Sequence, residues 1–138
     1  MSNPIIITID GFASTGKSTI AKKISSHLKY NYVDTGSIYR AITLLSINNG
    51  FLESDSINID LLKNSLDKSS FVLNSKTNKL YFNQSQLDDK IRSYKVSESV
   101  SLIAKISFVR SFVLEQLRSL KISKGLVIEG RDIGSVVF

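Results

Sequence analysis

The apolar residues of this chain recur at spacings that predict strands and helices in alternation. Residues 5–9 read Ile-Ile-Ile-Thr-Ile, a short apolar run typical of a buried strand. Apolar residues at helical spacing follow, and they predict a helix over residues 18–28. A second short apolar run predicts a strand at 30–33. The chain therefore begins as strand, loop, helix and strand.

A second helix is indicated by apolar residues that share one helical face, Ile38, Ala41, Ile42 and Leu45. We expect it to stop at 48–50, where Asn-Asn-Gly tolerates the left-handed backbone of a helix end. The pattern then changes and predicts a short helix at 59–66 and two strands, 70–73 and 80–83, joined by a polar turn. We interpret residues of about 51–92 as a small inserted subdomain.

The last third of the chain returns to the first pattern. Apolar residues at helical spacing predict two helices, at 96–103 and 109–120. Gly125 and an apolar strand at 126–128 follow them. Helices thus alternate with apolar strands, and no internal repeat stands out. This order predicts an α/β fold in which helices flank a parallel sheet, with a single domain over residues 1–138.

The turn after the first strand carries the most specific chemical signal. Residues 11–18 read Gly-Phe-Ala-Ser-Thr-Gly-Lys-Ser and match the phosphate-binding pattern G-x-x-x-x-G-K-[ST] at every fixed position. The glycines let the backbone curl so that several N–H groups face one anion. Lys17 can reach the outer phosphates, Ser18 offers a hydroxyl to Mg²⁺, and the following helix directs its positive end at the anion.

This motif predicts that the chain binds a nucleoside triphosphate. The candidate nucleotide-binding residues are Gly11, Phe12, Ala13, Ser14, Thr15, Gly16, Lys17, Ser18 and Thr19, and Ser18 is also the candidate metal ligand. The alternative is a glycine-containing turn that spells the motif by chance. The strand before it and the helix after it favour the phosphate-binding interpretation.

Two further polar segments follow predicted strands. Residues 129–134 read Glu-Gly-Arg-Asp-Ile-Gly and stand after the last strand, where open α/β sheets bind ligands. Residues 34–40 read Asp-Thr-Gly-Ser-Ile-Tyr-Arg and stand at a helix entrance. Alone, the first could be a charged surface turn and the second an ordinary helix cap. Their combination with the phosphate-binding loop indicates a ligand site.

Composition narrows the chemistry. The chain of 138 residues is 42% hydrophobic and has no cysteine, which excludes disulfides, thiolate nucleophiles and thiolate-bound zinc. Any metal would be bound through oxygen. The net charge of +6 could suit nucleic acid, but the lysines are spread without a basic block and without interleaved aromatic residues. With no membrane span and no secretion signal in the sequence, we expect a cytoplasmic protein without nucleic-acid or membrane partners.

Taken together, the motifs resemble the bacterial cytidylate kinase family, the CMP/dCMP kinases among the P-loop nucleoside monophosphate kinases. The resemblance rests on Ile9-Asp10-Gly11 with the loop, on 34–40, on Ser101 with Val109-Arg110, and on 130–134. It spans essentially the whole chain. It implies a P-loop kinase fold with an inserted NMP-binding subdomain, and transfer of the γ-phosphoryl group of ATP, with Mg²⁺, to CMP or dCMP.

The resemblance also implies roles for individual residues. Thr35, Arg40 and Arg131 would approach the monophosphate, and Ser101, Arg110 and Asp132 would face the cytosine ring. The candidate substrate-binding residues are therefore Thr35, Gly36, Arg40, Ser101, Arg110, Arg131 and Asp132, and the candidate catalytic residues are Lys17 and Arg131. Cytosine carries acceptors beside a donor amino group, so an arginine next to an aspartate matches it and mismatches uracil.

The chain departs from the family pattern in several places. Family members continue past the position of Phe138 with further strands, a mobile lid and more arginines, so we expect the C-terminal part of the sheet and the lid to be missing. The 5–9 strand would then be an unpaired edge. Phe12 and Ala13 replace the usual proline and small residue, and Glu129 replaces the usual aspartate.

Several functional interpretations follow from these observations. The leading one is a cytidylate kinase that forms CDP or dCDP and ADP, monomeric when complete. Its alternative is a truncated nucleotide-binding remnant, or half of a split kinase that a second fragment completes, with little activity alone. A GTPase switch would need a guanine-reading N-K-x-D segment, which the sequence lacks. The lone histidine, His27, falls on the first predicted helix, away from all three polar segments.

Overall fold

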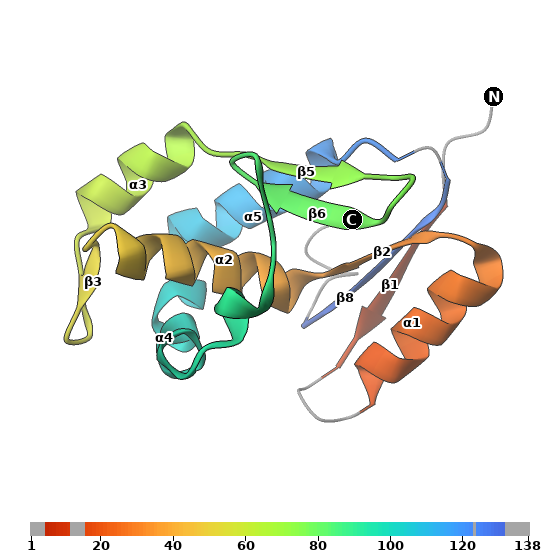
Figure 1. Cartoon of the computed structure of the whole chain (residues 1–138), viewed down its shortest axis with the longest axis horizontal. Helices are drawn as coiled ribbons and strands as arrows, with labels where there is room; N and C mark the ends of the chain where they lie inside the picture. The colour runs from red at the N-terminus through yellow and green to blue at the C-terminus, as the bar shows by residue number, and fades with distance from the viewer. Residues whose placement is uncertain (1–4, 12–15, 123, 132–138) are drawn as a thin grey trace.

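The central feature of the computed structural model, which describes residues 5–11, 16–122 and 124–131, is a parallel sheet with helices around it (Figure 1). Its strands are β1 (Ile6–Asp10), β8 (Leu126–Gly130) and β2 (Asn31–Asp34), in the order β1-β8-β2. Both pairings are parallel. The carboxyl ends of all three strands therefore meet at one edge, and the predicted fold class is confirmed.

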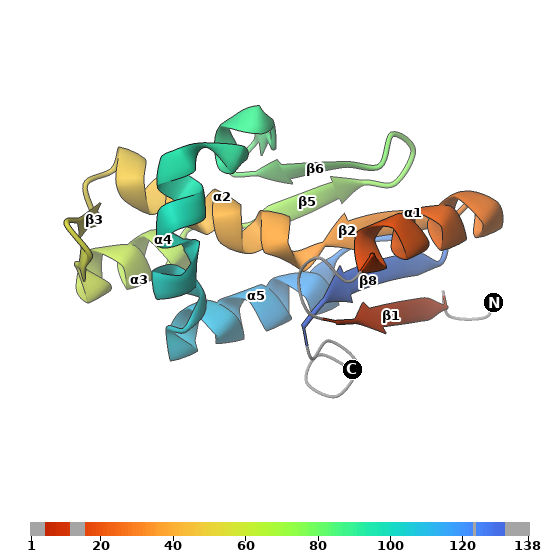
Figure 2. The same cartoon turned by 90° about the horizontal axis from the view of Figure 1, so that it is seen from below.

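The middle strand β8 is buried along its whole length because helices cover both of its faces. Leu126 and Ile128 belong to the main hydrophobic core, which contains residues of α2 and α5. Side chains alternate along a strand, so Val127 and Glu129 point to the opposite face. That face is contacted by α1 (Lys17–Leu28), which runs along the sheet apart from the other helices (Figure 2).

The two helices that follow the outer strands begin where the sequence predicts. Gly16 precedes α1 with a left-handed φ of 83°, a conformation that favours glycine. Helix α2 (Thr35–Asn48) is capped by the Asp34 side chain, which accepts a hydrogen bond from the Gly36 amide. It ends as expected, since Gly50 takes a φ of 73°.

The segment 51–92 contains the predicted helix and strands together with elements that were not predicted. Helix α3 (Ile59–Asp67) and strands β5 (Phe71–Asn74) and β6 (Lys79–Phe82) match the expectation. The unpredicted elements are β3 (Leu52–Glu53), β4 (Ser56–Ile57), β7 (Ser85–Gln86) and the 3₁₀ turn η1 (Asp89–Arg92). Strands of two residues carry no periodicity, so the sequence pattern does not reveal them.

The same segment packs against the helices that follow it. The rings of Phe71 and Phe82 stack with centroids 4.2 Å apart, and Phe71 also meets Phe112 of α5 (Ser107–Ser119) at 6.3 Å. The Phe71 amide donates to Gln116 Oε1 at 2.8 Å. Helix α4 (Tyr94–Ala104) packs on α2. One hydrophobic core therefore joins the segment to α2 and α5.

The two outer strands of the sheet differ in what lies beside them. The turn between β5 and β6 covers the outer edge of β2, where Asn78 Oδ1 accepts from the Tyr32 amide at 2.9 Å and from Asn31 Nδ2 at 3.2 Å. In the described residues no strand pairs with the outer edge of β1. Ile5 and Ile6 are 61% and 39% exposed there.

None of the helices within the described ranges is both long and apolar enough to cross a membrane.

Replacement of Gly125 should destabilise the fold. A Cβ at this buried position would overlap the ring of Tyr30. We expect Gly125→Ala to lower the free energy of unfolding by about 1–3 kcal/mol, as overpacking does, measured by urea denaturation. In a Tyr30→Ala background the ring is absent, so the same substitution should cost much less. Equal costs in both backgrounds would contradict the overlap.

Candidate functional site

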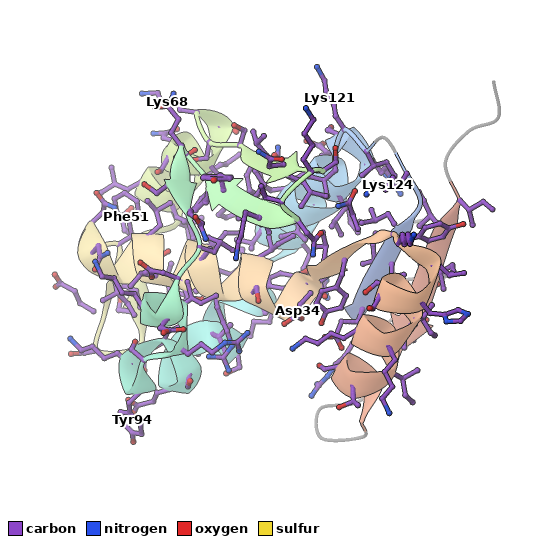
Figure 3. The ribbon with its side chains drawn as sticks, turned by 45° about the vertical axis from the view of Figure 1, so that its right-hand side comes forward. Asp34, Phe51, Lys68, Tyr94, Lys121 and Lys124 are labelled. Carbon is purple, nitrogen blue, oxygen red and sulfur yellow. The ribbon has the colours of Figure 1, made fainter. Side chains whose placement is uncertain are left out.

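The carboxyl edge of the sheet brings the predicted polar segments together. Asp10 is in register with Gly130, and Asp34 with Glu129. The amide of Gly11 donates to the carbonyl of Gly130 at 3.2 Å, which ties the start of the predicted phosphate-binding loop to the end of β8. Asp34 lies at the junction of β2 and α2, between α1 and the other helices, whereas Lys68, Lys121 and Lys124 project from the periphery (Figure 3).

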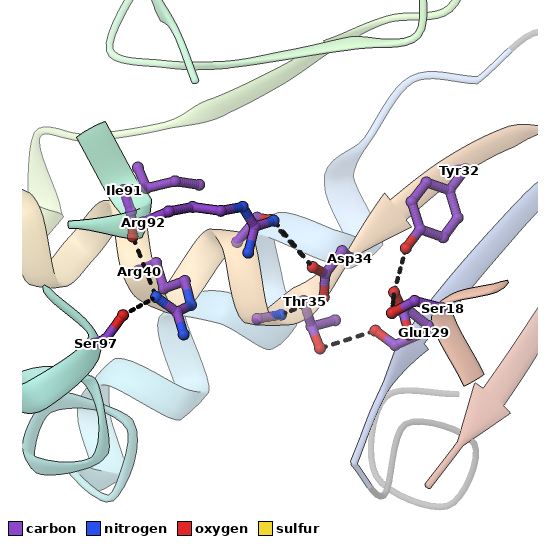
Figure 4. Close-up of polar contacts among 11 residues, drawn as sticks. Ser18, Tyr32, Asp34, Thr35, Arg40, Ile91, Arg92, Ser97 and Glu129 are labelled. Carbon is purple, nitrogen blue, oxygen red and sulfur yellow. Dashed lines mark hydrogen bonds and ion pairs between the residues drawn. The ribbon is translucent and has the colours of Figure 1, made fainter. Parts of the chain in front are cut away.

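The Glu129 side chain is the centre of this site. It is 1% exposed, and its Oε1 accepts hydrogen bonds from the hydroxyls of Ser18, at 2.7 Å, and Tyr32 (Figure 4). The carbonyl of the same residue accepts from Thr35 Oγ1 at 2.9 Å. Glu129 therefore joins the starts of α1 and α2 to the end of β8.

The second oxygen of this carboxylate has no hydrogen-bond partner. Glu129 Oε2 is buried and unpaired within the described part of the chain, as is Asn31 Oδ1. An unsatisfied buried carboxylate oxygen is costly, and native proteins keep such atoms where a water, an ion or a ligand completes them. The same carboxylate accepts from the Ser18 hydroxyl through Oε1, and such a group of oxygens suits a hard cation.

The donor set fits magnesium better than a metal held wholly by protein. Among residues 5–11, 16–122 and 124–131 no three His, Cys, Asp or Glu side chains gather into a metal-binding group. Mg²⁺ commonly takes one or two protein oxygens and completes its shell with waters and phosphate oxygens. Ser18 and Glu129 can supply such oxygens.

Tyr32 stays protonated through the neutral range. Burial raises the pKa of its phenol well above the ordinary value, and the hydrogen bond to Glu129 and the negative charge of Asp34 raise it further. The hydroxyl therefore acts as a donor to the carboxylate.

A second group of polar contacts surrounds the start of α2 (Figure 4). Arg92 Nη2 lies 3.9 Å from Asp34 Oδ2 and donates to Ser37 Oγ at 3.4 Å. Arg40 Nη1 donates to Ser97 Oγ at 2.9 Å and to the Ile91 carbonyl at 3.3 Å. Both of these hydrogen bonds use Nη1 of Arg40, so they leave Nη2 and Nε unengaged. A cleft of about 280 Å³ lies between this region and the β5–β6 hairpin.

The structure places four of the predicted substrate residues on three helices, Thr35 and Gly36 on α2, Ser101 on α4 and Arg110 on α5. Thr35 is 4% exposed and its hydroxyl proton is used within the fold, as is the Gly36 amide. Arg110 of α5 lies near enough to Tyr39 of α2 that its charge lowers the pKa of that phenol, against the larger rise caused by burial. Ser101 is exposed on α4.

Other predicted residues are placed at the edge of the described region. Lys17 and Thr19 lie in the first turn of α1, and Arg131 is exposed after β8. Five predicted residues lie outside the described ranges: Phe12, Ala13, Ser14, Thr15 and Asp132.

Glu129 and Tyr32 are two site residues for which the sequence predicts no individual role. The available signal for Glu129 was a carboxylate at the carboxyl end of an apolar strand, where open α/β sheets bind ligands. For Tyr32 it was strand alternation, because residues 32 and 34 share a face of β2. Neither signal says that the two side chains touch.

Comparison with known proteins points to one family. A family model described as cytidylate kinase matches residues 7–138. The cytidylate kinase of Flavobacterium psychrophilum is 44% identical, over 97% of this chain and 61% of its own length. That of Porphyromonas gingivalis is 42% identical, over 100% and 62%, and that of Phocaeicola vulgatus 42%, over 97% and 60%. The chain thus spans about three fifths of the length of these curated relatives.

The raised pKa of Tyr32 predicts a late step in an alkaline titration. Its phenol should ionise well above pH of about 10, the ordinary tyrosine value. Tyr32→Phe should remove this last rise in phenolate absorbance, whereas Tyr94→Phe, at an 80% exposed position, should leave it. The folded state retains the proton longer than the unfolded state, so the stability from this group is intact below pH of about 10 and is lost above it. An unchanged late step in Tyr32→Phe would contradict the assignment.

Proposed function

The chain belongs to the cytidylate kinase family, and we propose that it binds ATP at the phosphate-binding loop and transfers the γ-phosphoryl group to CMP or dCMP. The products are ADP and CDP or dCDP. The single observation that supports this most directly is the buried Glu129 carboxylate, which is bonded to Ser18 of the loop and has one unpaired oxygen. The relatives are named for this activity, and the chain matches about three fifths of their length.

ATP would be held mainly by the backbone of the loop, from Gly11 to Thr19. Helix α1 begins at Lys17, so its positive end and the lysine charge face the same anion. Lys17 would offset the charge that develops on the transferring group. Its role is electrostatic and positional, since phosphoryl transfer requires little covalent chemistry from the protein.

Mg²⁺ would be held at Ser18 and Glu129, together with phosphate oxygens and waters. When bound, the ion would neutralise phosphate charge and fix the orientation of the polyphosphate. The Ser18 hydroxyl now donates to Glu129. The Ser18 hydroxyl oxygen and the Glu129 carboxylate are therefore close enough to bind the same ion.

CMP would bind beside the start of α2. Arg40 and Arg131 would pair with its phosphate, and Thr35 and Gly36, whose donors bind Glu129 and Asp34 within the fold, would flank it. Ser97 and the Ile91 carbonyl hold Nη1 of Arg40, which supports a fixed orientation of the guanidinium. We further propose that residues 51–92 form the NMP-binding subdomain, because this segment borders the cleft beside Asp34 and Arg92.

The cytosine ring would be read by Ser101, Arg110 and Asp132. A donor arginine next to an acceptor aspartate complements cytosine, whereas uracil would leave buried polar groups unpaired. The proposed partners are thus ATP and a cytidine monophosphate, without nucleic acid or membrane, and the proposed location is the cytoplasm.

The acceptor needs no catalytic base. A phosphate monoester has a second pKa near 6, so it is largely ionised at neutral pH. Chain residues have to orient it in line with the γ-phosphoryl group, neutralise charge and exclude water.

Replacement of Lys17 tests the proposed activity. Lys17→Ala should lower turnover of CMP with ATP by about 100-fold or more. The substitution removes the positive charge that would offset the negative charge developing in the transition state. Lys22→Ala, an exposed lysine on the same helix, should leave turnover unchanged. ADP release in the presence of CMP is the measurement. Wild-type turnover in Lys17→Ala would refute the assignment, and ATP binding without turnover in the wild type would favour the nucleotide-binding alternative.

Replacement of Arg110 tests the reading of the base. Arg110→Met should lower kcat/KM for CMP by about 10–100-fold, the cost of losing a charged hydrogen bond. The KM for ATP should stay the same. Arg118→Met, further along the same helix, serves as the matched control. Equal effects of both substitutions would exclude a specific role for Arg110.

A further inference from the structure

The contact between Tyr32 and Glu129 has no assigned role in the proposed reaction. Two hydroxyl groups, of Ser18 and Tyr32, donate to the same carboxylate oxygen, Oε1. The other oxygen, Oε2, is buried and unpaired in the described part of the chain. A carboxylate has about four lone-pair sites distributed over both oxygens. The donors are therefore concentrated on one side of the group.

The sheet register explains how the phenol reaches the carboxylate. Tyr32 of β2 is in register with Val127 of β8, two residues before Glu129. Because side chains alternate, Val127 and Glu129 share the face that α1 covers. Tyr32 therefore reaches Glu129 along the diagonal, a distance that long aromatic side chains span between neighbouring strands.

Tyr32 is itself held from outside the sheet. Its amide donates to Asn78 Oδ1 at 2.9 Å, and the neighbouring Asn31 is bonded to the same turn through Asn78 and the Ser75 carbonyl. The phenol therefore projects from a backbone position that is fixed by the β5–β6 turn. The packing of that turn therefore helps to fix the position from which the Tyr32 hydroxyl bonds to the Glu129 carboxylate.

We propose that Tyr32 is a positioning residue for magnesium-bound ATP: its hydroxyl, with that of Ser18, holds Oε1 of Glu129 so that Oε2 is kept for the metal or its bound water. This inference rests on the proposed function. It assigns Tyr32 a part in the preference for Mg²⁺–ATP over metal-free ATP. It requires no contact between Tyr32 and substrate.

A purely structural role predicts a different result from a positioning role. If the phenol served only to satisfy a buried carboxylate, its removal would lower stability and would weaken all nucleotide binding alike. If it orients the carboxylate, its removal lets the group turn and share Oε2 with Ser18. The loss then falls on binding with Mg²⁺ and spares binding without it.

The test measures the affinity for ATP with Mg²⁺ and with a chelator, by calorimetry on the full chain. The ratio of the two dissociation constants is the readout. In Tyr32→Phe we expect this Mg²⁺ preference to fall about tenfold, the cost of one hydrogen bond to a charged group, with metal-free affinity unchanged. Tyr81→Phe, at a similarly half-buried tyrosine on β6, is the matched control and should keep the wild-type ratio.

A double-substitution cycle establishes whether Tyr32 acts through Glu129. In a Glu129→Gln background, Tyr32→Phe should not reduce the Mg²⁺ preference further, because the carboxylate that it positions is gone. If Tyr32→Phe does not fold, as judged by circular dichroism, Tyr32→Met gives the same reading. Methionine lacks the hydroxyl and is flexible enough to fill irregular space.

The outcomes separate this inference from the proposed function. An unchanged ratio in Tyr32→Phe, or equal losses with and without Mg²⁺, would overturn the positioning role while wild-type binding of Mg²⁺–ATP still supported the proposed function. A folded wild-type chain that binds no ATP under either condition would overturn both.

Discussion

The burial of one negative charge at the end of the central strand constrains the rest of the site. Glu129 lies where helices cover both faces of β8, so water cannot solvate its carboxylate, and the group needs hydrogen bonds from the protein. Ser18 and Tyr32 provide them from α1 and β2. The need to satisfy this charge therefore fixes the approach of the first helix to the sheet, and with it the helix end that would receive phosphate.

The alternation of side chains along β8 divides the molecule into a packing side and a chemical side. Leu126 and Ile128 join the core with α2 and α5, and Val127 and Glu129 face α1. The last residue of the second set is charged, and it lies at the carboxyl edge of the sheet. A single strand thus anchors the fold through one face and organises the site through the other.

The main elements were predictable because their signals are local. The apolar runs of β1 and β8, the stripe of α2 and the G-x-x-x-x-G-K-S motif each lie within a few neighbouring residues. The two-residue strands were missed for a physical reason. The turns that join them place Ser54, Asp55, Asn83 and Gln84 at positive φ, where glycine is the usual sequence signal and none is present. The Tyr32–Glu129 contact joins residues 97 positions apart, which periodicity and motifs do not pair.

The Asn78 side chain has a consequence for the sheet as a whole. By accepting the Tyr32 amide, it occupies a backbone donor that an incoming strand would need, so the β2 side is closed to further pairing. On the β1 side, no strand among the described residues pairs with the outer edge. Within the described residues, a strand that extends the sheet would therefore add next to β1 and not next to β2.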